Sequence, residues 1–374
     1  MGRLRARHWL AVTTAAVLIV VAARADVTVS STSGTMSIVA DVAADAAAST
    51  PDQLAAAEPE PEPEVPPEDE PTEAAPPAGP LWPLTGLPAN GGDIERPVLM
   101  MKIDNHPNAR RGQTGLELAD LVFDVRAEVV TRFAAVFHTN IPNPVGPVRS
   151  SRTSDFDLLL GFDTPLYGSS GGNDYVASAL RRLPIVALTN LTRQEYFRDG
   201  ENSAPHNLFV NADDLYALAP DDLPPPGPWF EYRLPGEALP AGATPVAGPV
   251  TVDFTGSSLV THTWDEDRAG WLRTQDGEPQ TSIDGEQLAP ENVVVMVTDY
   301  STSPADAISP EVRSTGTGEV IVLTDGHAIT GTWERPDATE PPTLLSERGE
   351  VIRLTPGRTW ILMPETGQTT IGDG

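Results

Sequence analysis

A short segment between Arg149 and Asp155 supplies two arginines, four hydroxyls and a carboxylate within seven residues. A Gly-Pro turn precedes this segment, and the apolar run Phe156–Phe162 follows it. Arginine is permanently charged and presents paired N–H donors that match the oxygens of a phosphate or a carboxylate. Arg149 and Arg152 are three residues apart, so they share one face if the segment is helical. The segment therefore predicts an anion-binding site at the start of a helix.

The hydroxyl residues of this segment allow two interpretations. Ser150, Ser151 and Thr153 are residue types that cap helices, and a helix beginning here would also direct backbone N–H groups at a bound anion. In the alternative, the same residues only cap the helix and pair with Asp155 and Asp157. The sequence leaves both open, and Ser150 belongs to the predicted ligand-binding residues.

A second polar group directly follows the apolar run Val98–Ile103, which predicts a buried strand. Open α/β sheets bind ligands just beyond the carboxyl ends of their strands. Asp104, Asn105, His106 and, slightly further on, Arg110 are therefore candidate site residues. Asp104 could hold a divalent cation with the Asn105 amide as a further ligand. The alternative is ordinary turn chemistry, because Asp and Asn side chains readily bond their own backbone.

Arg132, His206 and Asn207 complete the expected walls of the site. His206 and Asp104 are the candidates for proton transfer, since an imidazole titrates close to neutral pH. The chain contains no G-x-S-x-G, H-E-x-x-H or zinc-ligand spacing, so no catalytic residue is assigned and enzymatic activity stays open. A structural alternative is that Arg132, Arg149 and Arg152 close internal ion pairs, with partners among Asp120, Asp124, Glu128 and Asp155.

Composition narrows the classes of function. The formal net charge is −29, which argues against general nucleic-acid binding because that function needs a basic face. Residues 96–206 nevertheless carry 12 basic and 12 acidic side chains, so the candidate site lies in a neutral third of an acidic chain. There is no cysteine, which excludes disulfides, a thiol nucleophile and a lipid-modified cysteine.

The chain divides into six segments by composition. Residues 1–25 read as a signal peptide or a membrane anchor, and residues 26–80 as a disordered tether rich in Ala, Pro and Glu. We expect an α/β (α+β) layered domain over 81–222, a Pro/Gly-rich linker over 223–248, a smaller and mostly β domain over 249–366, and a frayed tail over 367–374. Both interpretations of residues 1–25 place the remainder outside the cytoplasm, with membrane contact only through that segment.

An ordered series of motifs resembles the YerB-like bacterial envelope proteins, which contain the N- and C-terminal parts of domain of unknown function 3048. The resemblance covers about residues 83–363 and implies an extracytoplasmic two-domain protein without a known activity. Family members are often lipoproteins, whereas this chain has no cysteine to modify. The matching motifs are Pro83–Gly86, Ile103–Arg110, Ala119–Phe123, Thr131–Phe133, Gly146–Arg152, Ala204–Asn207, Asn292–Val295, Thr317–Glu319, Gly331–Trp333 and Pro356–Trp360.

A more distant resemblance concerns the LytR-CpsA-Psr phosphotransferases, which attach glycopolymers to the cell wall. It implies that Arg132, Arg149 and Arg152 clamp phosphates, and that Asp104 or Asp155 holds Mg²⁺. Phosphoryl transfer depends mainly on positioning and charge neutralisation, which such residues could supply. Outside this alternative, no cofactor is evident.

The sequence thus predicts an extracytoplasmic envelope protein that binds an anionic, phosphate- or carboxylate-bearing envelope ligand. The expected partner is that ligand or another envelope protein, and not a nucleic acid. Two alternatives stay open: a phosphotransferase acting on a lipid-pyrophosphate-linked glycopolymer, and a non-enzymatic structural envelope protein.

Overall fold

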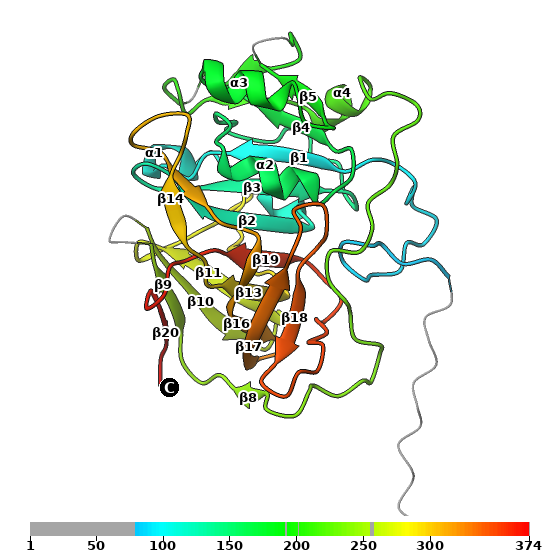
Figure 1. The fold of residues 1–374 in the computed structure, drawn as a ribbon, viewed down its shortest axis with the longest axis vertical. Helices are drawn as coiled ribbons and strands as arrows, with labels where there is room; N and C mark the ends of the chain where they lie inside the picture. The colour runs from blue at the N-terminus through cyan, green and yellow to red at the C-terminus, as the bar shows by residue number, and fades with distance from the viewer. Residues whose placement is uncertain (1–78, 191–192, 201, 255–257, 374) are drawn as a thin grey trace, which may run out of the picture. The chain divides into compact units, whose positions relative to one another are not determined.

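The computed structural model describes residues 79–190, 193–200, 202–254 and 258–373 (Figure 1). The predicted signal or anchor at 1–25, and the predicted tether up to residue 78, lie outside these described residues. All described residues belong to one compact unit. Within them, no helix is both long enough and apolar enough to cross a membrane.

One mixed sheet of eleven strands organises this unit. Ten of them follow the order β18-β17-β16-β13-β19-β2-β3-β1-β4-β5, and β8 pairs with β17 at the side. The bounds are β1 Leu99–Ile103, β2 Leu121–Arg126, β3 Thr131–Phe137, β4 Leu166–Ser169, β5 Val186–Thr189, β8 Thr244–Pro245, β13 Asn292–Met296, β16 Gly316–Thr324, β17 His327–Arg335, β18 Thr343–Ser346 and β19 Thr359–Leu362.

Strand β19 joins the two halves of this sheet. It pairs in parallel with β2 on one side, through Trp360 and Val122, and in parallel with β13 on the other, through Trp360 and Val293. Figure 1 shows β19 in red between β2 and β13, although it is one of the last elements of the chain. Five strands that precede residue 224 and five that follow residue 290 therefore share one continuous sheet.

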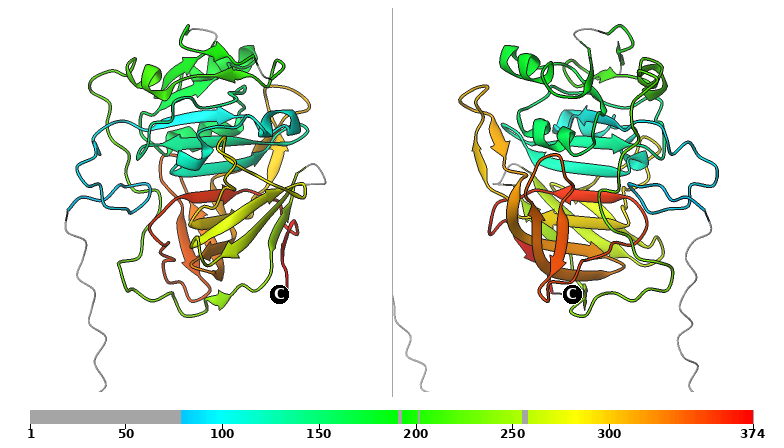
Figure 2. Two further views of the ribbon diagram at one scale, coloured as in Figure 1. Left: turned by 180° about the vertical axis from the view of Figure 1, so that it is seen from behind. Right: turned by 45° about the vertical axis from the view of Figure 1, so that its right-hand side comes forward.

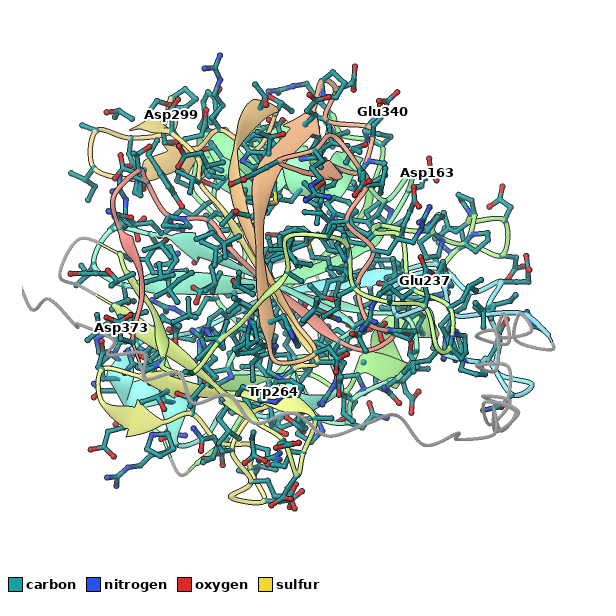
Figure 3. All side chains as sticks on the ribbon, turned by 90° about the horizontal axis from the view of Figure 1, so that it is seen from below. Asp163, Glu237, Trp264, Asp299, Glu340 and Asp373 are labelled. Atoms are coloured by element: carbon teal, nitrogen blue, oxygen red, sulfur yellow. The ribbon has the colours of Figure 1, made fainter. Side chains whose placement is uncertain are left out.

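A second sheet of five strands, in the order β12-β11-β10-β9-β20, packs against β13, β16, β17 and β19 through shared apolar side chains (Figure 2). Trp264 of β10, labelled in Figure 3, packs against Trp271 of β11, and their ring centroids are 5.2 Å apart. The bounds are β9 Val250–Asp253, β10 Leu259–Asp265, β11 Gly270–Gln275, β12 Glu278–Pro279 and β20 Thr369–Ile371.

Short helices and two small hairpins cover the main sheet. The helices are α1 Pro107–Arg110, α2 Ser154–Leu160, α3 Asp174–Leu180 and α4 Ala212–Tyr216, with a 3₁₀ turn at Leu116–Leu118. The hairpins pair β6 Phe197–Arg198 with β7 Leu208–Phe209, and β14 Tyr300–Thr302 with β15 Pro310–Val312. Mixed strands with few helices confirm the predicted α+β fold class.

The central strands β1, β2 and β3 are mainly apolar and almost entirely buried, because both faces of the sheet are covered. In β3, Ala134 and Val136 enter one apolar cluster, while Phe133, Ala135 and Phe137 enter the cluster on the opposite face. Strand β11 instead alternates between buried and less buried residues, as expected for a sheet with one covered face. The runs that the sequence predicted as buried strands are therefore the centre of the molecule.

Local sequence signals can be compared with the structure. An Asp-Gly pair between two apolar runs is typical of a type I′ hairpin turn, and Asp325 and Gly326 have the positive φ angles of such a turn, 49° and 69°. The expectation of a frayed end is wrong for Thr369–Ile371, which pairs with β9. Asn173 caps α3 by accepting a hydrogen bond from the Val176 N–H.

Candidate functional site

The segment that carries the two arginines runs beside the end of β1. The Asp104 N–H donates to the Pro147 carbonyl at 2.8 Å, and the Arg149 N–H donates to the Lys102 carbonyl at 2.8 Å. On its other side, the Ser170 N–H beyond β4 donates to the Arg149 carbonyl at 2.9 Å. These backbone contacts hold the predicted arginine segment next to the predicted Asp104 segment, at the carboxyl ends of β1 and β4.

Asp104 is the buried centre of this junction, with an exposed fraction of 1%. Its Oδ2 atom lies 2.6 Å from Nδ1 of His206 and 3.3 Å from Nε of Arg149, while Oδ1 accepts the His106 N–H at 3.0 Å. The Arg149 Nε is enclosed but has no hydrogen-bond partner, because its N–H is not aligned with the carboxylate. The structure therefore brings four of the predicted site residues together around one carboxylate.

His106 and His206 stack on each other, with ring centroids 4.5 Å apart and an angle of 19° between the planes. His106 caps α1, because its Nδ1 accepts the Asn108 N–H at 3.2 Å. Burial lowers the pKa of His106, and the adjacent His206 lowers it further. His106 is therefore favoured in its neutral form.

Arg132 and Arg152 share one carboxylate. Glu128 accepts from Nε of Arg152 at 2.5 Å and from a terminal nitrogen of Arg132 at 3.2 Å. Burial and the nearby Arg152 charge lower the pKa of Arg132 to about 10. Burial opposes ionisation of Glu128, but the hydrogen bond from Arg152 and the charge of Arg132 outweigh it, and the pKa of Glu128 falls to about 2. Two arginines against one glutamate leave this group with an excess positive charge.

Asp155 belongs to a different, fully buried group. Lys102 of β1 lies 2.6 Å from Oδ1 of Asp155, and the Tyr167 hydroxyl and the Arg152 N–H both donate to Oδ2 at 2.8 Å. Both members of the ion pair are almost inaccessible to solvent, at 2% and 0% of their side chains. Asp155 therefore anchors α2 beneath the arginine segment, and a metal ion would have to displace Lys102 to reach it.

The helix begins later than an anion-binding helix start would require. Arg149 and Arg152 precede α2, which begins at Ser154, so they do not share a helical face. The Ser151 N–H donates to the Gly171 carbonyl, and the Arg152 N–H to Asp155. The backbone donors of the segment are thus used within the fold, and the guanidinium groups and hydroxyls form the candidate site.

A pocket of about 330 Å³ opens beside the arginine segment. The Ser150 and Ser170 hydroxyls on its wall lie 3.1 Å apart, and Ser151 donates to Ser169 at 2.8 Å. One acid, Asp306, also lines the pocket and accepts from the Ser309 hydroxyl at 2.8 Å. The lining residues are Ser150, Ser151, Arg152, Ser170, Gly172, Asn173, Val176 and Asp306.

The β14–β15 hairpin contacts this site although it lies about 150 residues later in the sequence. No sequence pattern predicted its contact with the arginine segment. The hydroxyls of Ser303 and Thr153 lie 2.8 Å apart, and Asn173 donates to the Ala305 carbonyl at 3.2 Å. Ser309 donates to Glu128 at 2.8 Å. Lys102 was equally unpredicted as a site residue, although it is the one lysine in the sequence and lies in a predicted strand.

The remaining predicted residues mainly support the backbone. Asn207 accepts from Arg198 at 2.7 Å and donates to the carbonyls of Asp199 and Asn202, so it shapes the loop that carries His206. Asn105 is buried and donates to Thr131 at 2.7 Å. Arg110 donates to the Asn105 carbonyl and pairs with Asp276 of the second sheet at 2.7 Å.

A buried chain of polar side chains links Asp104 to the second sheet. Gln113 donates to the Asp104 carbonyl at 2.5 Å and accepts from Gln280 at 2.7 Å. Arg273 of β11 donates to Gln280 at 2.6 Å and to Asp124 of β2 at 2.6 Å. Residues from the C-terminal half therefore help to fix the position of Asp104.

The described residues also define other features. A larger pocket, of about 620 Å³, lies between the β6–β7 hairpin and the loop around Ile283, and its lining includes Phe197 and Phe209 but none of the predicted site residues. Among the described residues, no group of three or more His, Asp or Glu side chains is placed to hold a metal ion.

Comparison with known families identifies the chain. The N- and C-terminal domains of a family described as protein of unknown function, DUF3048, match residues 84–224 and 250–361. The chain belongs to this family. Its sequence resemblance to the YerB-like proteins is thereby confirmed.

Two comparisons extend over most of the chain. A candidate lipoprotein named YerB, from Bacillus subtilis (strain 168), is 27% identical over 312 residues, which cover 78% of this chain and 88% of the relative. The crystal structure of the YerB protein from Bacillus subtilis matches with a TM-score of 0.68 and 24% identity, over 78% of this chain and 99% of the other. The structural match concerns the fold alone.

Proposed function

We propose that this protein is an extracytoplasmic cell-envelope protein that binds an anionic, phosphate- or carboxylate-bearing ligand beside Arg149. The name of the YerB relative supports the location, since it describes a lipoprotein candidate. Here, residues 1–25 would direct export or anchor the chain, because the sequence has no cysteine to carry a lipid.

The incomplete bonding of Arg149 is the observation that carries the proposal. Its guanidinium makes no hydrogen bond with any described residue, and its enclosed Nε contacts Asp104 only as an ion pair at 3.3 Å. A guanidinium held by the fold but left with unused donors can take a phosphate or carboxylate in a bidentate manner. The excess charge of Arg132 and Arg152 over Glu128, and the serine-lined pocket next to them, favour the same ligand class.

Phosphoryl transfer gains no specific support. Each of the two carboxylates that could hold Mg²⁺ in the phosphotransferase alternative is engaged by a cationic side chain, Asp104 by Arg149 and Asp155 by Lys102. A ligand-binding function needs neither carboxylate to be free. The proposal is therefore limited to binding.

Isothermal titration calorimetry at low ionic strength, with propyl phosphate and with butyrate as probes, tests the proposal. We expect the wild type to bind at least one probe, and Arg149→Ala to bind it at least about tenfold more weakly, because a charge-assisted pair is lost. Arg353→Ala is the matched control, since Arg353 is a half-exposed arginine paired with Glu231 and Glu237. The proposal fails if the wild type binds neither probe, or if both variants lose affinity equally.

A further inference from the structure

The stacked pair of His106 and His206 has two ring nitrogens that the anion-binding proposal does not use. The two rings come from α1 and from the loop between β6 and β7. Each ring uses Nδ1 within the fold. Neither Nε2 bonds to a described residue, and neither is among the enclosed unpartnered atoms of the described residues. Two ring nitrogens thus face outward beside Arg149.

The tautomer of His206 follows from its partner. Its Nδ1 lies 2.6 Å from Oδ2 of Asp104, the same oxygen that pairs with Arg149. An ionised carboxylate only accepts hydrogen bonds, so Nδ1 of His206 carries the hydrogen. In the neutral ring, Nε2 of His206 is then a hydrogen-bond acceptor.

His106 has the opposite tautomer. Its Nδ1 accepts the backbone N–H of Asn108 at 3.2 Å, so this nitrogen carries a lone pair. Burial and the neighbouring His206 lower the pKa of His106 and so favour the neutral ring. The hydrogen of that neutral ring is on Nε2, which is therefore a donor. The stacked pair presents one acceptor and one donor next to a guanidinium.

A fully ionised phosphate or carboxylate can satisfy only the donors of this set, because its oxygens carry no hydrogen. A hydroxyl group can donate to Nε2 of His206 and can also accept from Nε2 of His106. We infer that the anion bound beside Arg149 carries a hydroxyl group close to its charge, as a glycerol phosphate or a sugar phosphate does. This inference rests on the binding function proposed above.

Calorimetry at pH 8 with glycerol 3-phosphate and propyl phosphate tests this inference. The two probes have the same charge and the same number of carbon atoms, and only the first has hydroxyl groups. We expect the wild type to prefer glycerol 3-phosphate by about tenfold, which is the usual worth of one to two hydrogen bonds. His206→Phe should remove the preference, which is the ratio of the two affinities measured in the same variant. A change in general anion affinity, caused by the Asp104 oxygen that His206 shares with Arg149, affects both probes and leaves this ratio unchanged.

Two further variants keep the test decisive. His106→Phe retains an aromatic ring for stacking and removes the Nε2 donor together with the Nδ1 cap of α1. It leaves the contact between His206 and Asp104 intact, so it should reduce the preference even if His206→Phe perturbs the fold. His327→Phe is the control, because His327 lies in the β16–β17 turn, away from the stacked pair, and should keep the full preference.

The possible failures are distinguishable. Equal, Arg149-dependent affinities for the two probes in the wild type would overturn the hydroxyl inference and leave the anion-binding function standing. Absence of binding by both probes would overturn the anion-binding function and the inference with it. A preference that survives in both His206→Phe and His106→Phe would show that the stacked pair does not create it.

Discussion

Arginines in two regions of this molecule have opposite relations to their surroundings. In the C-terminal half, Arg273 is wholly buried, donates to Asp124, Gln280 and Gln275, and lies 4.3 Å from the ring centroid of Trp360. Arg335 is 1% exposed and donates to the carbonyls of Glu340, Ser314, Asp157 and Ala338.

Arg149 is also held in place by the fold, through its backbone, yet its guanidinium makes no hydrogen bond with a described residue. Arg132 and Arg152 lie between these extremes, since each has carbonyl contacts but both depend on one glutamate for charge. One nitrogen of Arg273, Nη1, also lacks a partner, but Nε and Nη2 donate to three side chains. The contrast teaches that an arginine indicates a binding site when its whole guanidinium makes no hydrogen bond within the fold. The number of arginines in a segment does not separate structural from binding roles.

The largest expected effect is the loss of stability on substitution of the buried Arg273. Arg273→Met should reduce the free energy of unfolding by about 3–5 kcal/mol, because it leaves Asp124 buried without its cation. Urea denaturation followed by circular dichroism measures this change. Arg149→Ala is the comparison variant and should change the same free energy by less than about 2 kcal/mol, because the buried Asp104 keeps its contacts with His206 and with the His106 N–H. Similar losses in both variants would remove the distinction between the two regions.

A smaller effect, a gain in affinity for phosphate, is expected on substitution of Glu128. Glu128→Gln removes the internal anion that Arg132 and Arg152 share, so a bound phosphate meets less competition. The affinity for propyl phosphate should rise by about three- to tenfold, which corresponds to about 1 kcal/mol. Glu231→Gln, at the half-exposed Arg353 pair, is the control. A fall in affinity would mean that Glu128 orients the arginines for the ligand and does not compete with it.

The smallest effect concerns acid stability. The pKa of Glu128 is about 2 in the folded protein and 4.5 for a glutamate without partners, as in the unfolded chain. The ion pairs of Glu128 therefore stabilise the fold fully above pH 4.5, and this stabilisation is lost as the pH falls towards 2. The difference in unfolding free energy between wild type and Glu128→Gln should therefore shrink by about 1 kcal/mol from pH 6 to pH 3, after allowance for solvent screening. A difference that grows on acidification would contradict the assigned ion pairs.

The sequence was most informative where local apolar character determines structure. The apolar run at 98–103 was predicted to be a buried strand and forms β1, because a mainly apolar strand is stable when both of its faces are covered. The neighbourhood of Asp104, Arg149 and His206 was also predicted, since each follows or precedes such an element.

The ion pairs and the covering hairpin were not predictable in the same way. Lys102 and Asp155 are 53 positions apart, and Thr153 and Ser303 are 150 apart. Neither pair leaves a periodic signal, because long-range contacts are set by the packing of whole elements. A helix at the arginine segment was predicted, but α2 begins only at Ser154. The Ser151 and Arg152 N–H groups donate instead to Gly171 and Asp155, and the contact with Gly171 depends on tertiary packing.

The position of β19 also has a consequence for the order of events during biosynthesis. This strand separates β2 from β13, yet it is made only when synthesis reaches residues 359–362. Until then, the growing chain has two unpaired strand edges at the centre of its future core, and these edges can pair wrongly. Folding that depends on such distant contacts is slow. The main sheet can therefore form only after nearly the whole chain has been made.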